Sequence, residues 1–238
     1  MQLTLDLTAV ETEPQEPELT GYEPITCAET NVARQLVRDI LKIIERGGVY
    51  YESYNDVFSR TIEVIEAAVL YEEDRYMELT SKMRPEAVKV CVDVMKPLMR
   101  MYSDFVVTDV LGLVYMEVAS RWKCSGLGQY FTPADICEMM AMMQLGDNVM
   151  EQVNDARAEG RRISICDPAV GSGAMLLAAK KVILKQAGIK GLRQFTFHGQ
   201  DVDMTCIRMC KIQLALTDYW YMGNRLICAA HDARSQNQ

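Results

Sequence analysis

The sequence predicts an α/β protein in which a helical amino-terminal region precedes a partial parallel sheet. Two observations lead to this prediction. Apolar residues in the first half recur at helical spacing, whereas in the second half helical patterns alternate with short apolar runs typical of strands. A length of 238 residues with 49% apolar residues allows one large or two small domains. We expect an acidic, mobile tail over residues 1–25, a helical domain over 26–124 and a sheet-containing domain over 125–238.

Four amphipathic patterns predict the helices of the first region. Each repeats apolar residues at three-to-four spacing, and Gly47 and Gly48 stop the first of them. Pro97 is expected to kink or divide the third helix, because proline removes a backbone donor and clashes with the preceding turn. The predicted helices are Asn31–Arg46, Tyr54–Tyr71, a helix that begins at Pro85, and Asp109–Trp122.

The second half predicts parallel strands, because each strand pattern is followed by a helix that can cross back over the sheet. A sheet of three strands has an edge that must be covered. Either the edge pairs with another subunit or the chain is a fragment of a longer one. The helices are expected from Pro133, Gly173 and Met204, and the strands near Ile163, Phe195 and Leu226.

Composition limits the possible classes of function. A net charge of −8 and a pI of about 4.9 argue against a chain that binds the DNA backbone unaided, since such binding depends on lysine and arginine. The 8 cysteines contain no C-x-x-C pair, which favours reduced thiols and no metal site. The chain has no charged-then-apolar leader and no apolar run near the ~20 residues that span a bilayer. We therefore expect a soluble, cytoplasmic protein without membrane contact.

The most informative segment is DPAVGSG, which runs from Asp167 to Gly173 between a short apolar run and the helix-forming stretch AMLLAAKKVILK. Glycines at positions 171 and 173 allow the backbone to approach a ligand, and the following helix presents unpaired N–H groups. This arrangement predicts a cradle for a nucleotide-like cofactor, with an acidic residue at the strand tip facing it. An ordinary strand-to-helix turn is the alternative.

Two flanking segments support the cofactor interpretation. GQYFTP opens a helix with Thr132 as N-cap and Pro133 at the first position, although such a cap alone indicates only a helix start. FHGQDVD places Asp201 at the end of an apolar strand, where one carboxylate can accept hydrogen bonds from two ribose hydroxyls. The alternative is that Asp201 or Asp203 only caps the next helix.

In this order the segments resemble the N6-adenine DNA methyltransferases, especially the modification subunits of type I restriction-modification systems and their single-chain relatives. DVLGLVYMEVASRW, before GQYFTP, also looks like those proteins, so the resemblance covers about Asp109 to Asp232. It implies a Rossmann-like methyltransferase core with S-adenosylmethionine as cofactor. In such a core, GQYFTP and the glycine segment DPAVGSG contact the methionine end, the strand tip GQDVD binds the ribose, and Asp232 binds the adenine. The cofactor-binding residues it implies are Gln129, Tyr130, Phe131, Thr132, Asp167, Ala169, Gly171, Gly173, Asp201, Val202 and Asp232.

One part of the family pattern is missing. Those proteins hold the target amino group with NPPF, NPPY or DPPY, whereas none of the 7 prolines here is adjacent to another. Methyl transfer to an exocyclic amine is accelerated mainly by alignment and by polarisation of the amine. We therefore assign no catalytic residue and expect methyl transfer to need another chain or segment. The resemblance implies that DNA is reached through a partner subunit, in a homo- or hetero-oligomer.

Two other functions remain as alternatives. The chain could be a non-catalytic regulatory or interaction protein that retains the methyltransferase fold. A nicotinamide-dependent oxidoreductase is disfavoured, because Leu176 stands where G-x-G-x-x-G has its last glycine.

The methionines at 139, 140, 142 and 143 follow GQYFTP on one predicted helix. They could be mistaken for a cofactor or metal site. We expect them to pack in the core instead, as methionine commonly does.

Overall fold

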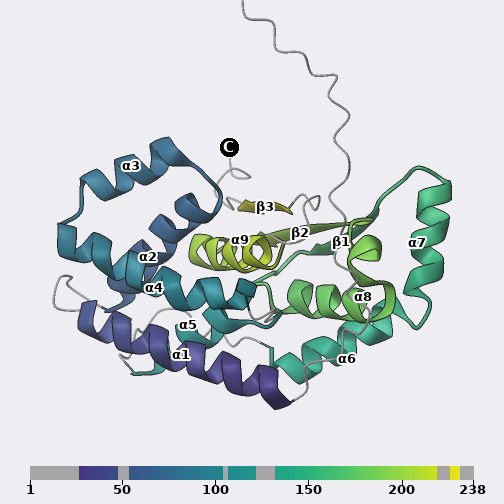
Figure 1. The fold of residues 1–238 in the computed structure, drawn as a ribbon, viewed down its shortest axis with the longest axis horizontal. Helices are drawn as coiled ribbons and strands as arrows, with labels where there is room; N and C mark the ends of the chain where they lie inside the picture. Colours follow the sequence, from purple (N-terminus) through teal and green to yellow (C-terminus); the bar gives the residue numbers. More distant parts are fainter. Residues whose placement is uncertain (1–26, 48–53, 104–106, 122–131, 219–225, 231–238) are drawn as a thin grey trace, which may run out of the picture.

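The computed structural model describes residues 27–47, 54–103, 107–121, 132–218 and 226–230, so the predicted acidic tail lies outside the described residues. Helices fill the first part of the chain, and strands alternate with helices after Ile163 (Figure 1). The elements are α1 (Cys27–Gly47), α2 (Tyr54–Val69), α3 (Glu73–Ser81), α4 (Pro85–Ser103), α5 (Val110–Arg121), α6 (Ala134–Leu145), α7 (Val149–Ala158), β1 (Ile163–Asp167), α8 (Ala174–Leu192), β2 (Phe195–Asp201), α9 (Met204–Asp218) and β3 (Leu226–Ala230).

The three described strands form one parallel sheet in the order β1-β2-β3, as the alternation of strands and helices predicts. Asp167 at the end of β1 pairs with Gly199 of β2, and Asp201 at the end of β2 pairs with Ala230 of β3. Because the strands are parallel, the segments that follow β1 and β2 leave from the same edge of the sheet. This edge carries the glycine segment and the acidic segment.

The four predicted amino-terminal helices are confirmed, and Pro97 lies inside α4 without dividing it. The structure adds α3 and α7, which the sequence patterns did not predict. None of the residues of α3 is buried, and α7 buries only Val149, Val153 and Ala156. Helices with so little apolar surface give no strong periodic pattern, since the pattern arises from the buried face.

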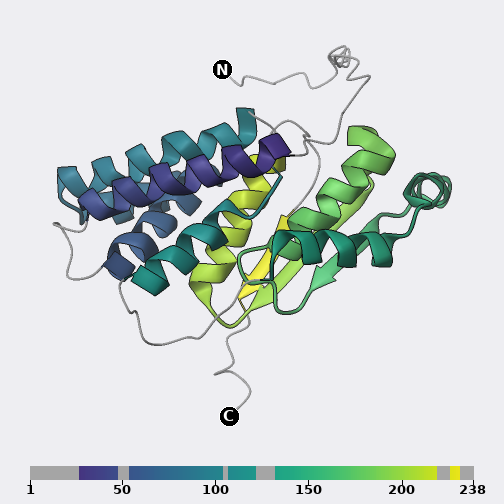
Figure 2. The same ribbon diagram turned by 90° about the horizontal axis from the view of Figure 1, so that it is seen from below.

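Helix α9 joins two hydrophobic cores. Met209, Ile212 and Leu216 pack into a core with α1, α2, α4 and α5, whereas Ile207 and Leu214 pack into a core with α6, α7, α8 and β2. Figures 1 and 2 accordingly show α9 between the helical region and the part formed by α6 to α8 and the sheet. The predicted boundary between residues 124 and 125 lies outside the described residues, and the division into domains stays a prediction.

The expectation that the methionines of α6 pack in the core is wrong. Their exposed fractions are 51% for Met139, 38% for Met140, 50% for Met142 and 77% for Met143. Helix α6 is apolar on several sides, and it buries the side that carries the smaller Cys137 and Ala141, in contact with α8. Within the described ranges, none of the helices combines the length and apolarity needed to cross a membrane.

Candidate functional site

The segment after β1 folds into a turn held to the tip of β2. The Asp167 carboxylate accepts a hydrogen bond from the Ala169 backbone N–H at 3.0 Å. The backbone N–H of Val170 donates to the carbonyl of Gln200 at 2.8 Å, and that of Gly173 donates to the Val170 carbonyl at 2.9 Å. The turn, residues 167–173, is called the cofactor loop below. It is fixed on one side by the strand that carries the second predicted acidic residue.

The two glycines of the cofactor loop both adopt left-handed backbone conformations, with φ of 54° at Gly171 and 99° at Gly173. Residues other than glycine rarely adopt these backbone angles. A Cβ at Gly173 would also lie 3.1 Å from the Cys210 sulfur of α9. The structure therefore gives Gly173 a role in close packing between the loop and α9.

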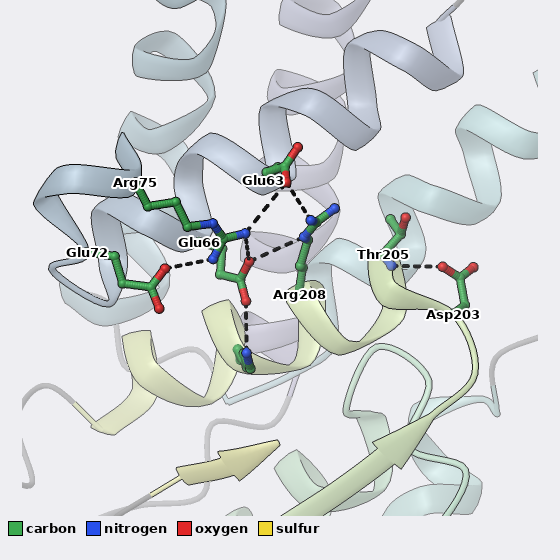
Figure 3. A network of polar contacts seen from close by, with 8 residues as sticks. Glu63, Glu66, Glu72, Arg75, Asp203, Thr205 and Arg208 are labelled. Atoms are coloured by element: carbon green, nitrogen blue, oxygen red, sulfur yellow. Dashed lines mark hydrogen bonds and ion pairs between the residues drawn. The ribbon is translucent and has the colours of Figure 1, made fainter. Parts of the chain in front are cut away.

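Asp201 connects the cofactor loop to β2. One oxygen of its carboxylate accepts the Gly171 N–H at 2.8 Å, and the other accepts the Asp203 N–H at 2.9 Å. Asp203 in turn accepts the N–H of Thr205 at 2.8 Å in the first turn of α9 (Figure 3). Of the two carboxylates that could cap α9, Asp203 does so, whereas Asp201 accepts hydrogen bonds from the loop and from the Asp203 N–H.

The surroundings of Asp201 fit the ribose of a nucleoside. A carboxylate oxygen has two acceptor positions, so each oxygen of Asp201 can still accept one hydroxyl group after its backbone bond. The side chain is half-buried, and the neighbouring Val202 is 79% exposed. A carboxylate next to an accessible apolar side chain offers the combination that a sugar and a base require.

Negative charge gathers at this edge of the sheet. Burial, together with the nearby Asp109 and Asp167, raises the pKa of Cys137 to about 11. Burial also raises the pKa of Cys206, with Asp203 as the next contribution. Both thiols are therefore protonated at neutral pH and are poor nucleophiles. A cationic group such as a sulfonium is favoured near these carboxylates.

GQYFTP is described only in part. Thr132 is exposed, and its carbonyl accepts the Cys137 thiol at 3.5 Å. The predicted side-chain cap by Thr132 is wrong, because Pro133 takes the N-cap position of α6 and no side-chain capping bond forms there. Asp167, Ala169, Gly171, Gly173, Asp201 and Val202 meet at one edge of the sheet, whereas Gln129, Tyr130, Phe131 and Asp232 lie outside the described residues.

The sequence patterns missed a buried polar cluster behind the cofactor loop. Ser172 donates its hydroxyl to Asp109 at 2.5 Å, and the Gln213 amide donates to Asp109 at 2.9 Å and to the Ser172 carbonyl at 2.8 Å. Asp109 lies 63 residues before Ser172, and Gln213 lies 41 residues after it. No local spacing relates them, although Ser172 between two glycines was a visible signal.

A separate groove of about 370 Å³ lies between α1 and α4. Its lining includes Arg46, Lys96 and Arg100, and none of its lining residues belongs to the cofactor loop. The candidate site is therefore defined by the loop and the strand tips and not by this groove.

The chain belongs to the N-6 DNA Methylase family, whose model matches residues 106–231, more than half of the 238 residues. This match, together with the parallel strand order, confirms the predicted family and fold class and supports S-adenosylmethionine as the cofactor. The methylase subunit of the type I restriction enzyme MpnII from Mycoplasma pneumoniae is 28% identical over 102 residues. The aligned part covers 43% of this chain and 16% of that subunit, so the chain spans a small part of this relative.

Two solved structures are similar at low identity. A putative class I S-adenosylmethionine-dependent methyltransferase from Listeria monocytogenes has a TM-score of 0.49 and 13% identity, over 83% of this chain and 53% of that one. The methyltransferase subunit of a type I restriction-modification system from Streptococcus thermophilus has a TM-score of 0.45 and 12% identity, over 88% and 60%. The family assignment does not depend on either structure.

Proposed function

We propose that this chain is the S-adenosylmethionine-binding part of an adenine-N6 DNA methyltransferase and that methyl transfer needs a further chain or segment. The observation that carries the proposal is the hydrogen bond from the Gly171 N–H to the Asp201 carboxylate at 2.8 Å. It joins the glycine turn after β1 to the acidic tip of β2 in one polar cradle. Membership of the N-6 DNA Methylase family supports the same cofactor.

In this proposal, different residues bind different parts of S-adenosylmethionine. Thr132 and Asp167 hold the methionine end, and Asp201 accepts the ribose hydroxyls. Val202 and Asp232 hold the adenine ring. When bound, S-adenosylmethionine supplies a methyl group on a positively charged sulfur. The acidic side chains around the loop favour that positive charge.

Methyl transfer by the chain alone is not expected, because the sequence has no NPPF, NPPY or DPPY segment to align the target amine. The sheet offers a place for a completing segment. β1 lies at an edge of the described sheet, and its Ser164 and Cys166 side chains are exposed. An added strand can pair with such an edge. We propose that the partner that brings the amine-holding loop also contacts DNA.

Calorimetric titration with S-adenosylmethionine tests the cofactor assignment. Asp201→Ala should weaken binding by about tenfold or more, because hydrogen bonds to a charged group contribute roughly 1.5–3 kcal/mol. The matched control is Asp155→Ala, which removes an exposed carboxylate on α7 and should leave the affinity unchanged. Equal heats for wild type and Asp201→Ala would remove the ribose assignment.

Methyl incorporation tests the need for a partner. The purified chain is incubated with unmethylated DNA and labelled S-adenosylmethionine, alone and with candidate partner chains. We expect label in DNA only in the mixtures that contain a completing chain. Label incorporated by the chain alone would contradict the proposal.

A further inference from the structure

In the buried cluster behind the cofactor loop, every polar side-chain atom of Asp109, Ser172 and Gln213 has a hydrogen-bond partner. Asp109 is 9% exposed, and Ser172 and Gln213 are 0% exposed. One carboxylate oxygen of Asp109 accepts the Ser172 hydroxyl, and the other accepts the N–H of Gly112 at 2.8 Å and the amide of Gln213 at 2.9 Å. The side-chain oxygen Oε1 of Gln213 accepts the N–H of Leu111 at 2.9 Å. The cluster therefore connects the start of α5, the cofactor loop and α9.

Ser172 is held at two points. Its hydroxyl binds Asp109, and its backbone carbonyl accepts the Gln213 amide. The residues on either side, Gly171 and Gly173, have left-handed φ values and no side chains that could restrain the turn. Glycine has the largest conformational freedom to lose on ordering. Asp201 restrains this part of the loop through the Gly171 N–H, and Ser172 is the residue of the turn whose own side chain can anchor it.

Gly112 shows how closely the helical region approaches the loop. A Cβ at this position would lie 2.1 Å from an Asp109 carboxylate oxygen and 2.5 Å from the Ser172 hydroxyl oxygen. Both distances are far below ordinary contact, so any side chain at 112 would displace the carboxylate from the serine. The bond between Asp109 and Ser172 requires glycine on the first turn of α5.

The charge of Asp109 is held without a cation among the described donors. Ser172, Gln213 and the Gly112 N–H are all neutral. Burial raises the pKa of Asp109, and these three hydrogen bonds oppose that rise. A buried group with neutral partners depends on their geometry, since a lost donor leaves an unpaired polar atom.

We propose that Asp109 is a positioning residue for cofactor binding: through Ser172 it sets the conformation of the Gly171–Gly173 turn and so couples the helical region to the cofactor site. This inference rests on the proposed function, and it adds a residue that none of the predicted cofactor contacts includes. Asp109 acts from behind the loop, through the serine.

Hydrogen exchange and cofactor affinity together test the inference. Gly112→Ala and Ser172→Ala break the Asp109–Ser172 bond from opposite sides, and Asp109→Asn keeps the shape and can still hydrogen-bond to the serine. The control, Glu66→Gln, alters a buried carboxylate that binds α9 through Arg208 and Lys211 and does not contact the loop. All are measured at a temperature at which each variant is folded.

Without ligand, amides of residues 167–173 should exchange about tenfold faster in Gly112→Ala and Ser172→Ala than in wild type. S-adenosylmethionine affinity should fall by about tenfold in the same two variants and stay within about twofold of wild type in Asp109→Asn and Glu66→Gln. Equal loop exchange in wild type, Gly112→Ala and Ser172→Ala would overturn the inference. So would an equal loss of affinity in Glu66→Gln.

The two proposals fail in different ways. If the wild-type chain does not bind S-adenosylmethionine, the proposed function fails, and the exchange measurement still reports whether Asp109 orders the loop. If the cofactor binds and the loop variants match wild type in affinity and exchange, only the positioning role fails. Should Gly112→Ala not fold, Ser172→Ala carries the same comparison, because it removes a hydroxyl and adds no bulk.

Discussion

Two buried carboxylates of the helical region face the α9 side of the molecule, and they are held in opposite ways. Glu66 is 2% exposed and is surrounded by cations: Arg75 at 2.8 Å and Arg208 at 3.3 Å (Figure 3), and Lys211 at 3.1 Å. Asp109 is held by neutral donors, and burial raises its pKa. Glu66 and its cations, called the Glu66 junction below, join α2, α3 and α9. Asp109 with Ser172 and Gln213, called the Asp109 junction, reaches the cofactor loop.

This difference indicates how one helical region can serve two purposes. Ion pairs of long side chains stabilise the contact between helices and tolerate small displacements. A cluster of short neutral donors around a carboxylate fixes positions closely, because every polar atom must keep its partner. We therefore infer that the Glu66 junction mainly stabilises the fold and that the Asp109 junction mainly positions the cofactor loop. Three variants distinguish these two roles.

The largest effect on stability is expected for Glu66→Gln. The change leaves three cations around a neutral amide, and loss of one partner of a buried ion pair costs about 3–5 kcal/mol. We expect the lower end, since the side chains of Arg75 and Arg208 keep exposed fractions of 33% and 18%. Urea denaturation measures the loss. A midpoint equal to that of wild type would show that the Glu66 ion pairs do not stabilise the fold.

A smaller loss of stability is expected for Ser172→Ala. The variant leaves one buried oxygen of Asp109 without its donor, which costs roughly 1–3 kcal/mol. Urea denaturation under the same conditions measures this loss of stability. Compared with Glu66→Gln, Ser172→Ala should lose less stability and more affinity for S-adenosylmethionine. If Ser172→Ala loses stability but keeps the loop exchange and the cofactor affinity of wild type, Ser172 stabilises the fold and does not position the loop.

The smallest effect is a dependence on pH. Because the folded-state pKa of Asp109 is raised above its ordinary value of 3.8, its contribution to stability is fully present below pH 3.8 and is lost as the pH rises through the raised pKa. Asp109→Asn lacks this dependence, so the stability of wild type relative to the variant should fall as the pH rises. Denaturation between about pH 3 and pH 8 measures the difference. If the difference in stability between wild type and Asp109→Asn does not change with pH, the pKa of Asp109 is not raised in the folded protein.

The sequence predicted what depends on periodicity and on local segments. The apolar spacing of α1, α2, α4 and α5 and the order of strands and helices after Ile163 are properties of short windows, and they were predicted correctly. Local segments also predict the loop glycines and Asp201 as site residues, and the structure brings them together at one edge of the sheet. Helix α3 was missed because it buries no residue.

Features that depend on distant contacts could not be predicted. The exposure of Met143 depends on which side of α6 meets α8, and an apolar helix gives no sign of that choice. The Asp109–Ser172–Gln213 cluster joins three segments with no shared spacing. Its members are a single acid, a serine and a glutamine, which are common residues with no recognisable motif.

The most direct test of the central claim is a pair of calorimetric titrations of the wild-type chain, one with S-adenosylmethionine and one with NAD. We predict saturable binding of S-adenosylmethionine at one site per chain and no saturable heat with NAD. Saturable binding of NAD, or no binding of S-adenosylmethionine, would contradict it.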